Sequence, residues 1–90
     1  MFKTLEELIA VIRQRKESSV EESYTYKLLK NKKLSVEKIK EEIAELIEAI
    51  EKNTNKVHEA ADVLYHLMVL LEANDIKIED VMNELKKRQK

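Results

Sequence analysis

At residues 38–45 the sequence reads KIKEEIAE, and at residues 59–62 it reads EAAD. Read as helices of about 3.6 residues per turn, these segments can be projected at about 100° per residue. In the first helix one apolar stripe then forms, made of Ile39, Ile43, Leu46, Ile47 and Ile50. A second stripe lies directly beside it and contains Lys38, Glu42, Glu45 and Ala49, with Glu41 at its outer edge. The acidic residues therefore flank the expected core.

The segment that follows residue 62 is apolar in almost every direction of the helical projection. Only a narrow polar line remains, and it consists of Glu59, Asp62 and His66. A helix that is hydrophobic nearly all round is a buried helix. Carboxylates on its one polar line must face a partner, a cavity or a ligand, because an uncompensated buried charge is costly. A divalent cation bound through oxygen ligands is the simplest compensation.

The composition predicts a small helical protein. Ninety residues fit one domain, residues 1–90, and no cysteine is present to add a disulfide. Neither glycine nor proline occurs, which favours helices and argues against hairpins. We therefore expect an all-α fold, a small bundle of about five helices whose core is completed by homodimerisation.

Charge and hydropathy exclude several classes of partner. The formal net charge is −1, so the chain has neither a basic nucleic-acid footprint nor an acidic tail. The longest wholly apolar run, residues 67–71, is too short to cross a bilayer, and the N-terminus lacks a signal-peptide pattern. We expect a cytoplasmic protein that binds neither nucleic acid nor membrane.

Capping residues predict the first three helix starts. A capping box at residues 4–7 would start the first helix, which should fade around Lys16 into the polar stretch 17–22. Ser23 and Asn31 would cap the two ends of a short second helix. Ser35 would cap the third, which should run to about residue 52.

The remaining boundaries follow from asparagines and apolar spacing. A turn at residues 53–55 should lead into a fourth helix from about 56 to 73, ending at Asn74 and Asp75. Asparagine is the best substitute for glycine where the backbone turns left-handed. The last helix, from about 78 to 87, should place Val81, Met82 and Leu85 inward.

Five carboxylates are the predicted metal ligands: Glu41, Glu42, Glu45, Glu59 and Asp62. A short turn makes their two helices antiparallel neighbours, so these side chains can converge. All-oxygen ligands select Mg²⁺, or Mn²⁺, over zinc. A di-iron site would need Glu-x-x-His pairs, whereas Asn55 and Val63 precede His58 and His66 by three residues. We interpret His66 as a hydrogen-bonded core histidine.

Hydroxyl side chains and lysines indicate phosphate binding near these acids. Ser23, Tyr24 and Thr25 stand at the start of the second helix, and Lys27 follows them. A helix N-terminus with hydroxyls and a nearby cation can receive phosphate. Lys27 and Lys38 would hold phosphate oxygens as point charges. The alternative for this segment alone is a capped helix with a tyrosine packed in the core.

Three segments together resemble one known family. They read SYTYKLL at residues 23–29, KIKEE at 38–42 and EAADVLYHL at 59–67. The acidic pattern looks like the signature of the all-α MazG-type nucleotide pyrophosphohydrolases. Within them, the serine-tyrosine-threonine run makes the chain similar to the phosphoribosyl-ATP pyrophosphatases of histidine biosynthesis, over residues 5–88.

This resemblance implies Mg²⁺-dependent hydrolysis of the α-β phosphoanhydride of phosphoribosyl-ATP to phosphoribosyl-AMP and pyrophosphate, by a homodimer with an interlocked helical core. It implies that the catalytic residues are Glu41, Glu42, Glu45 and Asp62, with Glu59 as a further metal ligand. It also implies a substrate pocket lined by Ser23, Tyr24, Thr25, Lys27 and Lys38. The chain departs from the family pattern at Lys40, where glycine is usual, and at Lys77, where a small capping residue is usual.

Two alternatives use the same residues differently. A house-cleaning pyrophosphohydrolase of the same superfamily would act on canonical or damaged dNTPs with the same metal ligands. A non-enzymatic helical interaction module would use the acids as salt-bridge partners across a dimer. Lysine- and glutamate-rich helices also produce Glu-Glu-x-x-Glu by chance, so that motif alone decides nothing.

Overall fold

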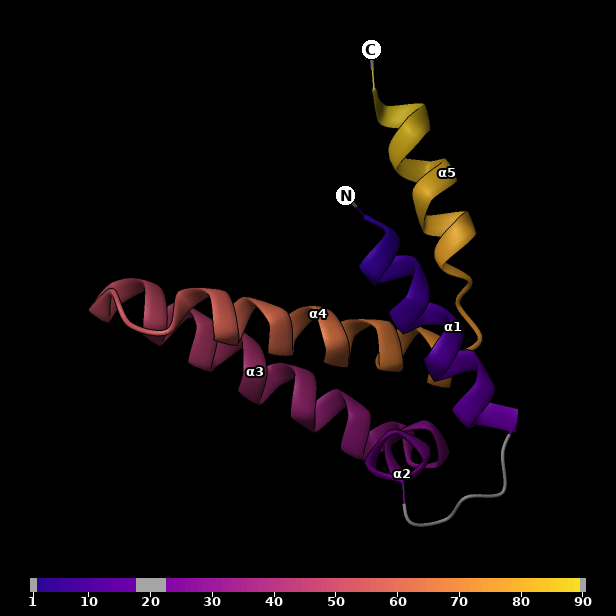
Figure 1. The fold of residues 1–90 in the computed structure, drawn as a ribbon, viewed down its shortest axis with the longest axis horizontal. Coiled ribbons are helices and arrows are strands. Elements are labelled where there is room, and N and C mark those ends of the chain that lie inside the picture. The colour runs from indigo at the N-terminus through magenta and orange to yellow at the C-terminus, as the bar shows by residue number, and fades with distance from the viewer. Residues whose placement is uncertain (1, 18–22, 90) are drawn as a thin grey trace.

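The computed structural model describes residues 2–17 and 23–89. Within them the chain forms five α-helices and no strand, so the all-α prediction is confirmed (Figure 1). The helices are α1 (Lys3–Glu17), α2 (Tyr24–Lys30), α3 (Lys32–Lys52), α4 (Lys56–Ala73) and α5 (Ile78–Arg88). The helices α3 and α4 lie side by side as a long hairpin, and α1 and α5 extend from the far end of α4 (Figure 1).

The start of α3 differs from the prediction. Asn31 caps it, because its side-chain oxygen accepts a hydrogen bond from the Leu34 N–H at 3.0 Å. The same residue ends α2, so it separates two helices without a loop. Ser35, the predicted cap, is buried one turn inside α3 and donates its hydroxyl hydrogen to the Leu28 carbonyl. It therefore fastens α3 to α2.

For the first two helices, one predicted N-cap is confirmed and the other is wrong. Ser23 caps α2 as predicted, accepting a hydrogen bond from the Tyr26 N–H at 3.3 Å. The predicted capping box at residues 4–7 is wrong, because α1 already begins at Lys3 and residues 4–7 lie inside it. The predicted polar stretch extends over residues 18–22, which lie outside the described residues.

The turns around α4 contain three residues with positive φ. Asn53 at 57° and Asn55 at 42° form the predicted turn between α3 and α4. After α4 the left-handed residue is Asp75 at 57°, whereas Asn74 has φ −105°, so the expected asparagine position is wrong by one residue. Both asparagine and aspartate tolerate this conformation better than most residues.

The core lies where α1, α2 and α4 meet. Its buried side chains are Ile12, Leu28, Leu29, Met68, Val69 and Ala73. Half of them come from the last two turns of α4, which agrees with the nearly all-round hydrophobicity of that helix. The acid-bearing turns of α3 and α4 lie outside this core.

The prediction that α5 places Val81, Met82 and Leu85 inward is wrong for two of the three. Met82 and Leu85 are about half exposed, at 49% and 47%, whereas Val81 is partly buried, and α5 contains no fully buried residue. Ile78, at the start of α5, packs against the hydrophobic core. An ion pair adds to this contact, in which Arg13 of α1 donates two hydrogen bonds of 2.9 and 2.6 Å to Glu79.

The apolar stripe of α3 is also left open. Ile43, Ile47 and Ile50 are exposed, and the Cα radius of gyration of 14.2 Å exceeds the value of about 12 Å expected for a compact domain of this length. No helix of the described residues is long and apolar enough to cross a membrane. The chain thus leaves a large part of its predicted core uncovered.

Acidification should detach α5 from α1. The hydrogen bonds from Arg13 lower the pKa of Glu79 from 4.5 to about 2. Because the pKa is depressed in the docked state, the pair stabilises docking above pH 4.5 and loses this effect as the pH falls towards 2. An NMR titration of the α5 amides should therefore show a transition in that range.

The matched controls are Glu79→Gln and Glu84→Gln. Glu84 pairs only within α5, with Arg88 at 3.3 Å, so its substitution should leave the transition unchanged. The Glu79→Gln protein should already show the detached shifts at neutral pH. A Glu79→Gln protein that titrates like the unsubstituted chain would contradict this account of docking.

Candidate active site

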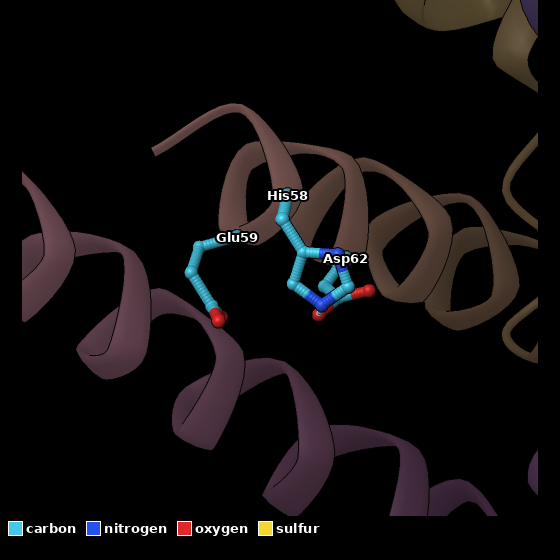
Figure 2. Close-up of side chains that lie close together, drawn as sticks. All are labelled: His58, Glu59 and Asp62. Carbon is cyan, nitrogen blue, oxygen red and sulfur yellow. Dashed lines mark ion pairs between the residues drawn. The ribbon is translucent and has the colours of Figure 1, made fainter. Parts of the chain in front are cut away.

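Three carboxylates converge between α3 and α4. Glu42 and Glu45 come from α3 and Glu59 comes from α4, and one oxygen of each lies within 4.8 Å of the others. Figure 2 shows the Glu59 side chain directed from α4 towards α3. The short turn at residues 53–55 produces this meeting, because it places the start of α4 beside the second half of α3.

Within the part of the chain that the structure describes, two oxygens in this group have no hydrogen-bond partner. They are Oε2 of Glu42 and Oε2 of Glu59, and both are buried. Burial raises the pKa of Glu42, and repulsion from the nearby Glu45 raises it further. The same two causes raise the pKa of Glu59. The ionised carboxylates therefore destabilise one another unless a positive charge joins them.

Asp62 lies one turn further along α4 and belongs to a second group. One ligand atom each from His58, Glu59 and Asp62 lies within 4.8 Å of the others, so Glu59 is common to both groups (Figure 2). His58 Nε2 is 3.4 Å from an Asp62 oxygen. His58 was not among the predicted metal ligands, although its i, i+4 spacing to Asp62 placed both on one face.

Glu41 is placed apart from these groups. Its carboxylate pairs with Lys38 Nζ at 3.3 Å on the surface of α3. This i, i+3 pair is exposed, and such pairs are weak. Lys38 therefore pairs with a carboxylate of its own helix in this structure. Its predicted contact with a substrate phosphate stays a prediction.

The hydroxyls of α2 are directed to protein partners. The Ser23 oxygen caps its own helix. The Tyr24 hydroxyl is 3.1 Å from His66 Nε2, and Thr25 shares a short hydrogen bond with Tyr65. Lys27 stands exposed in the last turn of α2. Tyr65 was not predicted, because nothing in the spacing of an apolar helix reveals a cross-helix hydroxyl pair.

His66 is the hydrogen-bonded core histidine that the sequence predicted. It is 7% exposed, and its Nδ1 lies 2.9 Å from the backbone carbonyl of Asp62. The ring packs edge-on against the rings of Tyr24 and Tyr65. His66 thus connects α2 to the turn of α4 that carries Asp62.

The donor set fits a hard divalent cation. Glu42, Glu45 and Glu59 supply only carboxylate oxygens, which Mg²⁺ and Mn²⁺ prefer. The two buried oxygens without partners are the atoms that such an ion would satisfy. No cysteine is present in the chain, which leaves nothing for a thiolate zinc site.

Comparison with known proteins agrees with this chemistry. A sequence profile described as phosphoribosyl-ATP pyrophosphohydrolase matches residues 5–89. A phosphoribosyl-ATP pyrophosphatase of Clostridium novyi is 46% identical over 96% of this chain and 81% of its own length. A protein of the same name from Methanococcoides burtonii is 41% identical over 94% of this chain and 91% of its own length.

A further relative is longer. The histidine biosynthesis bifunctional protein HisIE of Pyrococcus furiosus is 48% identical over 96% of this chain. The match covers only 41% of that protein, so the chain spans less than half of its length. The profile match over almost all described residues shows that the chain belongs to the phosphoribosyl-ATP pyrophosphohydrolase family.

Proposed function

We propose that this chain hydrolyses the α-β phosphoanhydride of phosphoribosyl-ATP, with addition of water, to phosphoribosyl-AMP and pyrophosphate. The observation that carries this proposal is the meeting of Glu42, Glu45 and Glu59 with two buried oxygens that have no partner. Family membership supports the substrate, and the name of the Pyrococcus furiosus relative supports a role in histidine biosynthesis.

The carboxylates have the role of metal ligands in this proposal. Glu42, Glu45, Glu59 and Asp62 hold Mg²⁺, or Mn²⁺ in its place. When bound, the ion polarises the phosphoanhydride and lowers the pKa of a water molecule. Glu41 joins these ligands when its partner Lys38 turns to a substrate phosphate, since the exposed pair is weak.

The start of α2 binds the substrate. Ser23, Tyr24 and Thr25 stand beside α4, one turn beyond Asp62, so a nucleotide held there reaches the acidic group. Lys38 and Lys27 supply positive charge for the phosphate groups. Burial raises the pKa of the Tyr24 phenol, and the positive charge of Lys38 opposes this effect in part.

Replacing Glu45 should abolish hydrolysis without unfolding the protein. Glu45→Gln removes the charge that acts on both Glu42 and Glu59 but keeps the shape of the side chain. The loss of a metal ligand should lower kcat/KM for phosphoribosyl-ATP by about 100-fold or more. The matched control is Glu48→Gln, because Glu48 pairs, among the described residues, with Lys52 on the same helix at 2.6 Å, and its loss should leave kcat/KM unchanged.

The substrate is tested by comparing phosphoribosyl-ATP with dNTPs in the same assay. A preference for dNTPs would overturn the substrate and leave the metal site in place. If Glu45→Gln instead lowered the melting temperature and no nucleotide were hydrolysed by the unsubstituted chain, the acids would be structural, as in an interaction module.

Adding Mg²⁺ should raise the melting temperature. A cation that binds only the folded chain stabilises it by mass action, about 2.7 kcal/mol at one hundred times the Kd. For a domain of this size, each kcal/mol shifts the melting temperature by about 4–8 °C. Scanning calorimetry with MgCl₂ and with KCl at equal ionic strength measures this shift.

The Mg²⁺-dependent shift in melting temperature, measured in single variants, identifies the carboxylates that bind the ion. Glu42→Gln and Glu59→Gln should shrink the Mg²⁺-dependent shift, because each removes a buried oxygen without a partner. Glu48→Gln should leave it intact. An equal shift in all these proteins, or none in the unsubstituted chain, would remove the metal centre from the proposal.

The open faces of the fold indicate that the working form is a homodimer. On α3 the apolar side chains Ile43, Ile47 and Ile50 are exposed, and Val57 and Leu64 of α4 are exposed as well. An exposed apolar stripe of this extent favours association. The extended shape of the single chain supports the same conclusion, because a second copy would cover what the first leaves open.

A charge within this stripe should separate the two copies. Ile47→Glu places a carboxylate on a side chain that is 51% exposed in the single chain and would be buried in a dimer. Light scattering after gel filtration should show a fall from the mass of two chains to that of one. Lys40→Glu adds a carboxylate to an exposed polar position of the same helix and should keep the mass of two chains. One chain's mass in the unsubstituted protein would contradict the dimer.

A further inference from the structure

Two hydrogen bonds tie the first turn of α2 to α4. The Tyr24 hydroxyl lies 3.1 Å from His66 Nε2, and Thr25 is hydrogen-bonded to Tyr65. The His66 ring is almost fully buried, while the Tyr24 residue remains 48% exposed. The bond thus joins a buried imidazole to a half-exposed side chain that the proposed function assigns to the substrate pocket.

The surroundings of His66 decide which atom carries the proton. Its Nδ1 lies 2.9 Å from the Asp62 carbonyl, and a carbonyl can only accept a hydrogen bond. Nδ1 therefore carries the hydrogen, and in the neutral ring Nε2 presents a lone pair. The Tyr24 hydroxyl is then the donor to Nε2. This assignment follows from the hydrogen-bond network.

The consequence for Tyr24 is that its only O–H hydrogen points inward. The phenol oxygen still has lone pairs for the pocket, so there it can accept but not donate a hydrogen bond. Phosphate oxygens also accept, and they repel such a group. Hydroxyl and amino groups of a ligand donate, and they suit it.

We propose that His66 is a positioning residue that holds Tyr24 as a hydrogen-bond acceptor for a hydroxyl or amino group in the nucleoside part of the substrate, and not for its phosphates. This inference rests on the proposed function and assigns one of its pocket residues to one part of the ligand. It gives Tyr24 a different role from that of Lys38, whose ammonium is suited to binding phosphate.

Four proteins test the proposal. Tyr24→Phe removes only the hydroxyl. His66→Asn keeps a donor near the position of Nδ1 for the Asp62 carbonyl but no longer reaches Tyr24. His66→Gln keeps an acceptor near the position of Nε2. The fourth combines Tyr24→Phe with His66→Asn. Each is assayed for kcat and KM with phosphoribosyl-ATP, and for inhibition by phosphoribosyl-AMP and by pyrophosphate.

Loss of one neutral hydrogen bond should weaken binding by about 3- to 10-fold. We expect Tyr24→Phe and His66→Asn to raise KM and the phosphoribosyl-AMP inhibition constant by this factor, with kcat and pyrophosphate inhibition within 2-fold of the unsubstituted enzyme. The double variant should be no worse than Tyr24→Phe, because both changes remove one interaction. His66→Gln should keep KM near its original value.

Other outcomes overturn the proposal. Equal weakening of pyrophosphate and phosphoribosyl-AMP would mean that Tyr24 contacts phosphate. Additive effects, or an unchanged KM in His66→Asn with a lower melting temperature, would give His66 a purely structural role. These results differ from failure of the proposed function, in which the unsubstituted chain hydrolyses no phosphoribosyl-ATP.

The proton assignment is tested without turnover. In ¹⁵N-histidine-labelled protein at pH 8, NMR should show the His66 hydrogen on Nδ1 and a bare Nε2 whose shift changes in Tyr24→Phe. The exposed His58 serves as an internal reference in the same spectrum. A hydrogen on Nε2 of His66 would refute the arrangement whatever the enzyme assays give.

Discussion

Carboxylates brought together between two packed helices repel one another, and the cost grows where their oxygens are buried. In this chain Glu42, Glu45 and Glu59 converge in this way, and the buried Oε2 atoms of Glu42 and Glu59 have no hydrogen-bond donor among the described residues. The hydrophobic core lies at the other end of α4 and contains none of these acids. The fold therefore divides into an apolar end that stabilises the chain and an acidic end whose negative charge a bound cation would offset. Burial and repulsion from nearby carboxylates raise the pKa values of Glu42 and Glu59. A bound cation would offset both effects.

Periodicity predicted most of this arrangement, because it reports which face of a helix is apolar. Together with the asparagines at its ends, it predicted the bounds of α4 and the convergence of Glu42 and Glu45 with Glu59, but not the separate position of Glu41. Periodicity failed where a side chain has more than one possible hydrogen-bond partner nearby. Asn31 took the capping role assigned to Ser35, because Ser35 reaches the Leu28 carbonyl on α2, a contact that only the tertiary structure reveals. The Tyr24 to His66 and Thr25 to Tyr65 bonds were unpredictable for the same reason.

An apolar pattern predicts that a helix face will be buried, but it does not identify the element or the chain that buries it. The isoleucines of α3 and the inward positions expected for α5 were predicted to be core, yet the chain leaves Ile47 and Met82 exposed. On α5 only the first turn is attached, through Ile78 packed against the core and an ion pair between Arg13 and Glu79, while Met82 and Leu85 stay open. An exposed ion pair buries little apolar surface and stabilises weakly. Of the five helices, α5 is therefore the one that packing within its own chain stabilises least.

The three-residue connection between α3 and α4 sets which side of α4 faces the acidic residues of α3. Asn53 and Asn55 are both left-handed, so the connection between Glu45 and Glu59 is a tight turn. One residue added inside the first turn of α4, with the connection itself unchanged, would rotate every later position of the helix by about 100°, which would swing Glu59 and Asp62 away from α3 while leaving the helix itself intact. Insertions and deletions here are thus tolerable only near whole numbers of helical turns. The length of this hairpin is as much a part of the acidic site as the acids themselves.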